Sequence, residues 1–257
     1  MNIVVCVKQI PDPAAPQAFD SSNNLDRSGK LILDEADTYG VEMALQLVDK
    51  AGAGEVTVVS MGSAADIAGL RNALAMGAAK AVIVSDDALR GTDALGTAKV
   101  LSSVIGRISP DLVLCATESS DGYTGTTPVQ VAELLGLPSI TFAKSVTIDG
   151  TNVKVDRQTE AGFDEVVAPL PARVTVTAGV VEPRYAFFKG IMAAKSKPVE
   201  ILSVADLGVA NLTGPKGARQ VIIEVVAAES RQAGEKYVDE GDGARKIVTF
   251  LESIKVL

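Results

Sequence analysis

The feature that most constrains the fold is an alternation of two kinds of segment, which occurs four times along the chain. Short apolar segments typical of buried strands alternate with segments in which apolar residues recur at the spacing of a helix. The strands are expected at residues 2–7, 55–60, 81–84 and 112–115, and the helices at 38–51, 63–77, 91–105 and 128–135. Because helical crossovers join parallel strands, the pattern predicts an α/β fold, a parallel sheet with helices on both faces. Hydrophobic residues make up 47% of the chain but aromatic residues only 4%, so its core should be aliphatic.

The turns before two of these helices have the residue spacing of a capping box. Ser63 and Asp66 have this spacing at the start of the second helix, and Gly77 can end that helix. Thr127 and Gln130 repeat the spacing before the fourth helix, with Pro128 at the first helical position. We therefore expect a capping box at both helix starts.

The pattern changes near residue 145. Short strands joined by Asp-Gly and Ala-Gly turns are expected at 146–148, 153–157 and 165–168. Residues 174–181 can then return to the main sheet as a further strand.

The chain beyond residue 183 differs from the part before it. A strand is expected at 220–227 and a last helix at 243–254, but these carry too little apolar surface to fold alone. We therefore expect an α/β nucleotide-binding domain over residues 1–183, followed over 184–257 by a partner-recognition loop and a C-terminal arm. The arm should pack on a partner, or alternatively fold back on its own domain.

Composition excludes several classes of function. The net charge is −8 without a basic stripe, which argues against nucleic-acid binding, and no apolar run approaches the roughly 20 residues of a membrane span. The chain has no histidine, so Ser–His and Cys–His catalysis and Cys/His metal clusters are not expected. Cys6 and Cys115 each lie in a strand-like segment, which favours free thiols and a reducing, cytoplasmic setting.

The segment that joins the fourth strand to the fourth helix is the most informative about ligands. In an open parallel sheet, ligands lie beyond the carboxyl ends of the strands, where helix starts offer unpaired N–H groups. Thr124, Thr126 and Thr127 add hydroxyl donors, and Gly125 lets the backbone approach a ligand closely. These features predict a phosphate cradle, with an ordinary capped helix and polar loop as the alternative. Neither a Walker lysine nor a dinucleotide fingerprint accompanies them.

Acidic residues precede the first helix. Asp34, Glu35 and Asp37 lie where carboxylates favour the helix dipole, which is one interpretation of the segment. In the other, their carbonyl and carboxylate oxygens receive an adenine or a ribose.

A second unusual segment spans residues 184–197. It gathers apolar side chains and positive charges in an acidic chain: Arg184, Phe188, Lys189, Ile191, Met192, Lys195 and Lys197. An apolar cluster with a basic rim is typical of a docking surface. The alternative is a short amphipathic helix that packs on its own core.

Nine short stretches, taken in order and with their spacing, resemble the electron-transfer flavoprotein beta subunit over essentially the full length. They are residues 4–9, 40–44, 74–78, 121–122, 170–171, 182–185, 191–195, 206–209 and 233–236. The resemblance implies an adenine-nucleotide-hydrolase-like fold without hydrolase activity. It also implies an electron carrier rather than an enzyme.

The resemblance further implies a heterodimer with an alpha subunit that holds most of a redox-active FAD. Such a complex takes electrons from flavoprotein dehydrogenases, such as acyl-CoA dehydrogenases, and passes them to a quinone oxidoreductase. The beta subunit of the family buries a structural AMP, with the phosphate here on residues 124–126. Carried over by position, the AMP contacts are Cys6, Asp34, Glu35, Ala36, Asp37, Met61, Ala116, Thr117, Glu118, Ser119, Ser120, Asp121, Gly122, Tyr123, Thr124, Gly125 and Thr126.

The chain departs from the family pattern at two places. Thr-Gly-Thr at 124–126 replaces the family's Asn-Gln-Thr, and Phe188-Lys189 stands where the docking loop usually has leucine and proline. Some members carry a second FAD in place of AMP and split electron pairs between two acceptors. We favour AMP because the turn lacks the Gln-Val-Gly-Pro pattern typical of that branch. A stand-alone, stress-protein-like nucleotide-binding module is a third interpretation.

Overall fold

The computed structural model describes residues 1–226, 234 and 236–257. Contacts divide the chain into two compact units, Met1–Ile223 and Glu224–Leu257. The first unit contains the sheet, and it extends 40 residues beyond residue 183. The second unit contains helix α8 (Gly243–Ser253).

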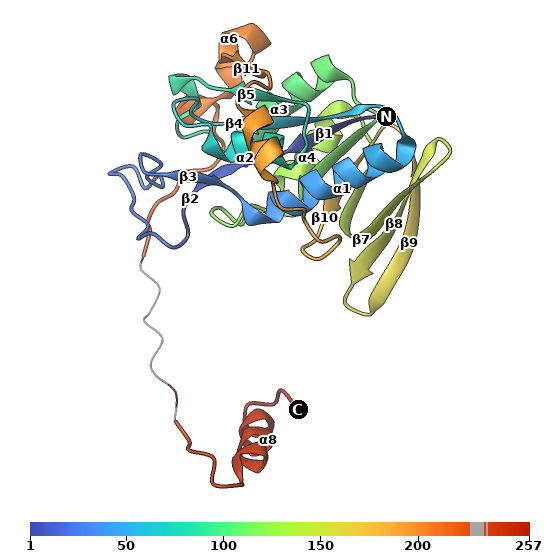
Figure 1. The fold of residues 1–257 in the computed structure, drawn as a ribbon. Helices are drawn as coiled ribbons and strands as arrows, with labels where there is room; N and C mark the ends of the chain where they lie inside the picture. The colour runs from blue at the N-terminus through green and yellow to red at the C-terminus, as the bar shows by residue number, and fades with distance from the viewer. Residues whose placement is uncertain (227–233, 235) are drawn as a thin grey trace. The chain divides into compact units, whose positions relative to one another are not determined.

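The described residues of the first unit form a nine-stranded sheet in the order β11-β5-β4-β1-β6-β10-β7-β8-β9 (Figure 1). Neighbouring strands from β11 to β7 are parallel, whereas β8 is antiparallel to both β7 and β9. The strand bounds are β1 Asn2–Cys6, β4 Glu55–Met61, β5 Lys80–Val84, β6 Leu112–Ala116, β7 Ser139–Asp149, β8 Asn152–Thr159, β9 Gly162–Pro169, β10 Ala172–Val176 and β11 Val199–Leu202. The predicted α/β fold is confirmed.

Helices cover both faces of the sheet and enclose two aliphatic cores. Ile3 and Val5 of β1 belong to the core under α1 and α2, whereas Val4 belongs to the core under α3 and α4. This alternation follows from the two-residue period of a strand. The helix bounds in the first unit are α1 Glu35–Ala51, α2 Ala68–Met76, α3 Ala94–Ile108, α4 Thr127–Leu135, α5 Phe188–Ala194, α6 Val204–Leu207 and α7 Gly214–Gly217.

Both predicted capping boxes are wrong. Helix α2 begins at Ala68, and the carboxamide oxygen of Gln9 accepts hydrogen bonds from the N–H groups of Gly69 (2.9 Å) and Leu70 (3.3 Å). Gln9 comes from the antiparallel hairpin of β2 (Gln9–Pro11) and β3 (Leu31–Leu33), which packs against this helix start. At α4, Thr126 occupies the N-cap position without a side-chain cap bond. A residue distant in the sequence, Gln9, therefore caps α2, whereas the local sequence predicted that Ser63 would cap it.

Other boundaries also differ from the sequence prediction. Strand β7 begins at Ser139, because its first residues pair in parallel with β10 before the rest pair with β8. The edge strand β11, parallel to β5, was not expected. The predicted strand at 220–227 is wrong over its described residues 220–226, which have no regular structure, while residue 227 lies outside the described residues.

Two further expectations concern the thiols and the last helix. Cys6 and Cys115 face each other in neighbouring strands as free thiols, as predicted. Helix α8 is confirmed in the second unit, and the side chains of Ile247, Phe250 and Ile254 are at least half exposed there. No helix among the described residues is long and apolar enough to cross a membrane.

Candidate functional site

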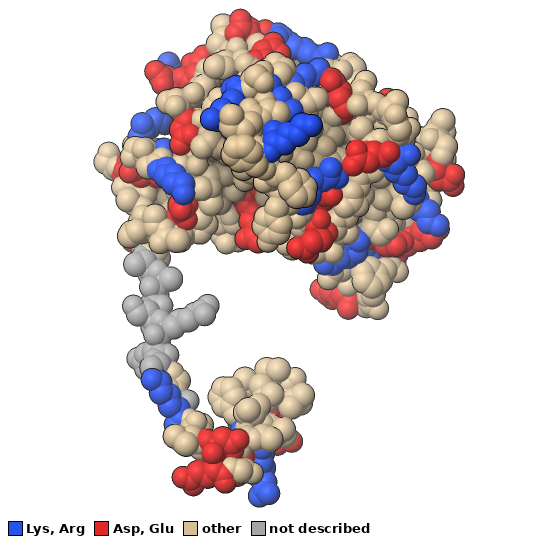
Figure 2. Space-filling model, in the orientation of Figure 1, with Lys and Arg blue, Asp and Glu red and all other residues tan. Residues whose placement is uncertain are grey.

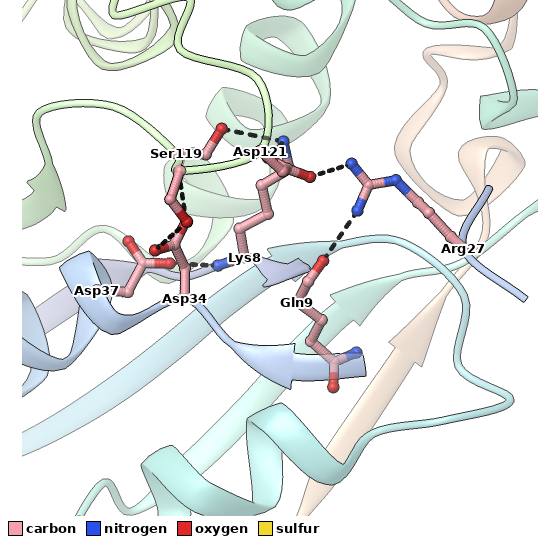
Figure 3. Close-up of polar contacts among 8 residues, drawn as sticks. Lys8, Gln9, Arg27, Asp34, Asp37, Ser119 and Asp121 are labelled. Atoms are coloured by element: carbon pink, nitrogen blue, oxygen red, sulfur yellow. Dashed lines mark hydrogen bonds and ion pairs between the residues drawn. The ribbon is translucent and has the colours of Figure 1, made fainter. Parts of the chain in front are cut away.

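Polar side chains gather where β1 and β6 end, at the point where the sheet changes winding direction. The chain proceeds from β1 outward to β4 and β5 on one side, and β6 lies on the other side of β1. Such a switch point leaves a crevice at the carboxyl ends of parallel strands, where ligands bind in open α/β sheets. Residues from the loop after β1, the start of α1 and the loop after β6 meet at these strand ends (Figure 3).

Asp34 ties these three segments together. It is fully buried, caps α1 by accepting from the N–H of Ala36, and donates its own N–H to the Lys8 carbonyl at 3.0 Å. Its carboxylate also accepts from the N–H of Ser120 at 2.8 Å and from the Ser120 hydroxyl at 3.0 Å. One carboxylate thus fixes the loop after β6 against the start of α1.

Two cations converge on the carboxylate of Asp121, whose side chain is only 6% exposed (Figure 3). Lys8 Nζ donates to Asp121 at 2.6 Å and to the Ser119 hydroxyl at 3.1 Å. Arg27 donates to the other carboxylate oxygen and to the Gln9 carbonyl at 3.2 Å. Burial alone would raise the pKa of Asp121, but the charges of Lys8 and Arg27 outweigh it and hold that pKa below its ordinary value.

These two cations keep donor capacity for a ligand. Each side chain is 39% exposed, and ammonium and guanidinium groups have more N–H donors than the contacts above use. Lys8 could have been found from the sequence because it follows the first strand directly. Arg27 could not, because it lies in a long polar loop and reaches the site only through the fold.

Asp37 is the most unusual ionisable group of the site. It is 6% exposed and accepts a hydrogen bond from the backbone N–H of Lys8 at 2.6 Å. Burial raises the pKa of Asp37 well above its ordinary value, and the nearby charge of Asp34 adds to the effect, while the Lys8 N–H opposes it. The carboxyl of Asp37 therefore favours its neutral, protonated form much more than an exposed aspartate does.

The predicted phosphate turn leads into α4. Gly125 has φ +63°, a left-handed conformation that favours glycine. Because no side chain caps α4, the N–H groups of Thr127 and Val129 are open to another acceptor, whereas Pro128 has no N–H. One feature opposes an anion: a Glu118 carboxylate oxygen lies 3.5 Å from the point that a Cβ on Gly125 would occupy.

The remaining predicted contacts lie around the strand ends. The neighbouring strands β1, β4 and β6 end at Cys6, Met61 and Ala116. The pKa of the Cys6 thiol is raised by a hydrogen bond with Cys115 and by burial. Ala36, Thr117 and Glu118 line a cavity of about 290 Å³. Glu35, Gly122, Tyr123 and Thr124 are exposed.

Within the described residues, no group of three or more His, Cys, Asp or Glu side chains could hold a metal ion.

The second candidate surface is helix α5 with the residues before it, and we call it the α5 surface: Tyr185, Phe187, Phe188, Ile191 and Met192, with Lys189 and Lys195 beside them. Its large apolar side chains are exposed, Phe188 to 79%, while the buried contact of the helix is made by Ala194. The segment is thus a short helix, but it does not pack through Phe188. In Figure 2, Lys and Arg side chains flank the uncharged surface over α5.

Two of the predicted rim cations have partners inside the chain. Arg184 Nε donates at 2.7 Å to the buried carboxylate of Glu42, and Lys197 Nζ donates to the carbonyls of Leu74 (2.8 Å) and Ala78 (2.7 Å). Lys189 and Lys195 are exposed, and neither forms an ion pair within the described residues.

Comparison with known proteins agrees with this architecture. The family described as Electron transfer flavoprotein domain matches residues 23–207. Electron transfer flavoprotein subunit beta of Mycobacterium tuberculosis is 38% identical over 264 residues, covering 100% of this chain and 99% of the relative. The protein of the same name from Thermoanaerobacterium thermosaccharolyticum is 36% identical over 261 residues, covering 100% of both. Protein FixA of Azorhizobium caulinodans is 32% identical over 266 residues, covering 99% of this chain and 94% of the relative.

The two beta-subunit matches extend over the whole chain. The chain therefore belongs to the electron transfer flavoprotein beta-subunit family, whose members are electron-transfer proteins rather than enzymes.

Proposed function

We propose that this chain pairs with an alpha subunit that holds most of a redox-active FAD. The heterodimer accepts electrons from flavoprotein dehydrogenases, such as acyl-CoA dehydrogenases, and passes them to a quinone oxidoreductase. The observation that carries this proposal is similarity to named beta subunits over the entire chain. The free thiols Cys6 and Cys115 support a reducing, cytoplasmic setting.

The chain's own task at the strand ends is to hold a structural AMP. The uncapped start of α4 and the turn at 124–126 suit the phosphate, since helix N-termini favour anions. The spare donors of Lys8 and Arg27 support the same assignment, and residues 34–37 are available to the adenosine part. Glu118 would have to turn away from Gly125 for the phosphate to approach closely.

The FAD supplies the electron chemistry when it is bound, and this chain supplies position. Residues 1–183 hold the nucleotide, and residues 184–257 provide the recognition loop and the arm. The exposed apolar side chains Ile247, Phe250 and Ile254 of the arm suit burial against the alpha subunit. The α5 surface is the docking site for the dehydrogenase, with Lys189 and Lys195 as its cationic rim and an acidic rim on the partner.

Reconstitution tests this proposal. Coexpressed with its alpha subunit, the chain should elute as a yellow heterodimer that a dehydrogenase and its substrate reduce. Expressed alone, it should be colourless, because it lacks a dinucleotide fingerprint. A matched variant that ends at residue 242 should form little heterodimer, because it lacks the apolar arm helix. A chain that stays monomeric beside the alpha subunit while retaining nucleotide would contradict the proposal and favour a stand-alone module.

A further inference from the structure

Helix α5 lies against α2 at a very short distance. A Cβ added to Gly190 of α5 would be 2.4 Å from the carbonyl oxygen of Ala75, which belongs to α2. Such a separation excludes any side chain, since Cβ atoms do not approach backbone oxygens below about 3 Å. The glycine therefore lets the two helix backbones meet directly.

The carboxyl ends of the two helices are bound by each other's cations. Arg71 of α2 donates from Nη1 to the carbonyls of Ala194 (2.6 Å) and Lys197 (2.8 Å), at and just beyond the end of α5. In return, Lys197, which follows α5, donates to the carbonyls of Leu74 in α2 and of Ala78 just beyond it. The last carbonyls of a helix lack intrahelical partners and carry partial negative charge, so each cation satisfies and stabilises the opposite helix end.

A third contact fixes the chain where it enters α5. Arg184 donates its Nε to Glu42 of α1 at 2.7 Å and its Nη2 to Asp49 at 3.1 Å. Glu42 is only 3% exposed, so this anchor belongs to the body of the first unit. The α5 segment is thus held at its entry by Arg184 and at its end by Arg71.

Helix α5 needs these contacts because it cannot order itself. It has seven residues, whereas isolated helices shorter than about 12 residues are marginal in water. Its largest side chains contribute little burial, because Phe188 is 79% exposed and Met192 is 49% exposed. A surface that is already ordered before a partner arrives avoids the entropic cost of ordering it on binding.

We propose that Arg71 is a positioning residue for docking, which holds α5 in the conformation that presents Phe188 and Met192 to the dehydrogenase. The proposal rests on the proposed function of the α5 surface. The Arg71 guanidinium is engaged by backbone carbonyls of its own chain. Its contribution is preorganisation, so it acts on partner affinity rather than on the electron-transfer step itself.

The test uses the full heterodimer with the Arg71→Met substitution, which keeps the length of the side chain but removes its donors. The KM for the heterodimer as electron acceptor should rise about five- to tenfold, as expected when binding must also order a loop, while kcat changes less than about twofold. Amides 188–195 should exchange hydrogen faster. Arg71→Lys should restore most of the affinity, because a lysine binds two carbonyls in the same way at Lys197.

A matched control is Arg107→Met. Arg107 also donates to a helix-end carbonyl, that of Asp206 at α6, but it lies outside the α5 surface, so its loss should leave KM unchanged. An unchanged KM for Arg71→Met would overturn the proposal, as would equal effects of Arg71→Met and Arg107→Met. If Phe188→Ala also left KM unchanged, the proposed docking function would fail as well. If Phe188→Ala raised KM, only the role of Arg71 would fail.

Discussion

The Phe188→Ala substitution should slow electron transfer from the dehydrogenase at least about tenfold at sub-saturating concentration, since anchors at an interface centre contribute roughly 2 kcal/mol or more. Phe188 is 79% exposed, so the side chain is free to enter an apolar pocket on a partner. Flavin and nucleotide contents should not change. Stopped-flow measurement of flavin reduction at several heterodimer concentrations gives the rate.

The fold should tolerate this substitution. Truncating an exposed side chain usually changes stability by less than about 0.5 kcal/mol, so thermal unfolding of Phe188→Ala should match that of the unchanged heterodimer. Phe163→Ala is a matched control, because Phe163 is 67% exposed on β9, outside the α5 surface. Normal transfer combined with a lower melting temperature would show that Phe188 is a packing residue and would contradict its role in docking.

The Asp37→Asn substitution should raise the stability of the chain at neutral pH. Burial raises the pKa of Asp37 in the folded state, so the folded chain binds this proton more tightly than the unfolded chain. The stabilisation that comes from binding this proton is fully present below about pH 4, the ordinary pKa of aspartate. It is lost as the pH rises toward the pKa of Asp37 in the folded state. Asparagine does not ionise, and its amide oxygen can still accept from the Lys8 N–H.

The difference between variant and unchanged chain should therefore grow with pH above about 4, by up to about 1.4 kcal/mol for each pH unit until the folded pKa is reached. Urea unfolding of the full-length chain at a series of pH values measures this difference. Glu133→Gln, which replaces an exposed carboxylate on α4, is the matched control. A constant difference between pH 4 and pH 7 would mean that Asp37 ionises like an exposed aspartate.

The sheet was predictable because its inner strands are short aliphatic segments buried on both faces. Strands β1, β4, β5 and β6 read directly from their Val, Ile and Leu content, as parallel strands do. Strand β11 was not predictable: it is an edge strand of four residues, none of them buried, and so has no comparable signal.

Helix starts were less predictable because their partners are distant in sequence. Ser63 and Asp66 had the spacing of a capping box, yet Gln9 satisfies the start of α2 from 60 residues away. The hairpin that carries Gln9 packs so closely on Gly69 that a Cβ there would be 2.8 Å from the Leu33 nitrogen. Local spacing cannot reveal such a tertiary cap.

The sequence predicted which segments form the candidate site, but it did not predict the two cations, Lys8 and Arg27, that bind Asp121 there. The segments 34–37 and 116–127 were expected from their place before or at helix starts, and Asp34 joins them through Ser120. Arg27 reaches Asp121 across 94 residues of sequence. Near the α5 surface, Arg184 and Lys197 are bound by groups of α1 and α2, and these contacts depend on how the helices pack. The sequence alone therefore did not show which cations are free to contact another protein.

We propose that this chain holds the nucleotide in an electron carrier with a single flavin. Purified heterodimer can be heated and the released cofactors separated by chromatography, with the native absorption spectrum giving flavin per protein. The expected result is one FAD and one AMP per heterodimer, with AMP lost when Lys8 and Arg27 are both replaced by methionine. Two FAD per heterodimer and no AMP would contradict the account and identify a carrier that splits electron pairs.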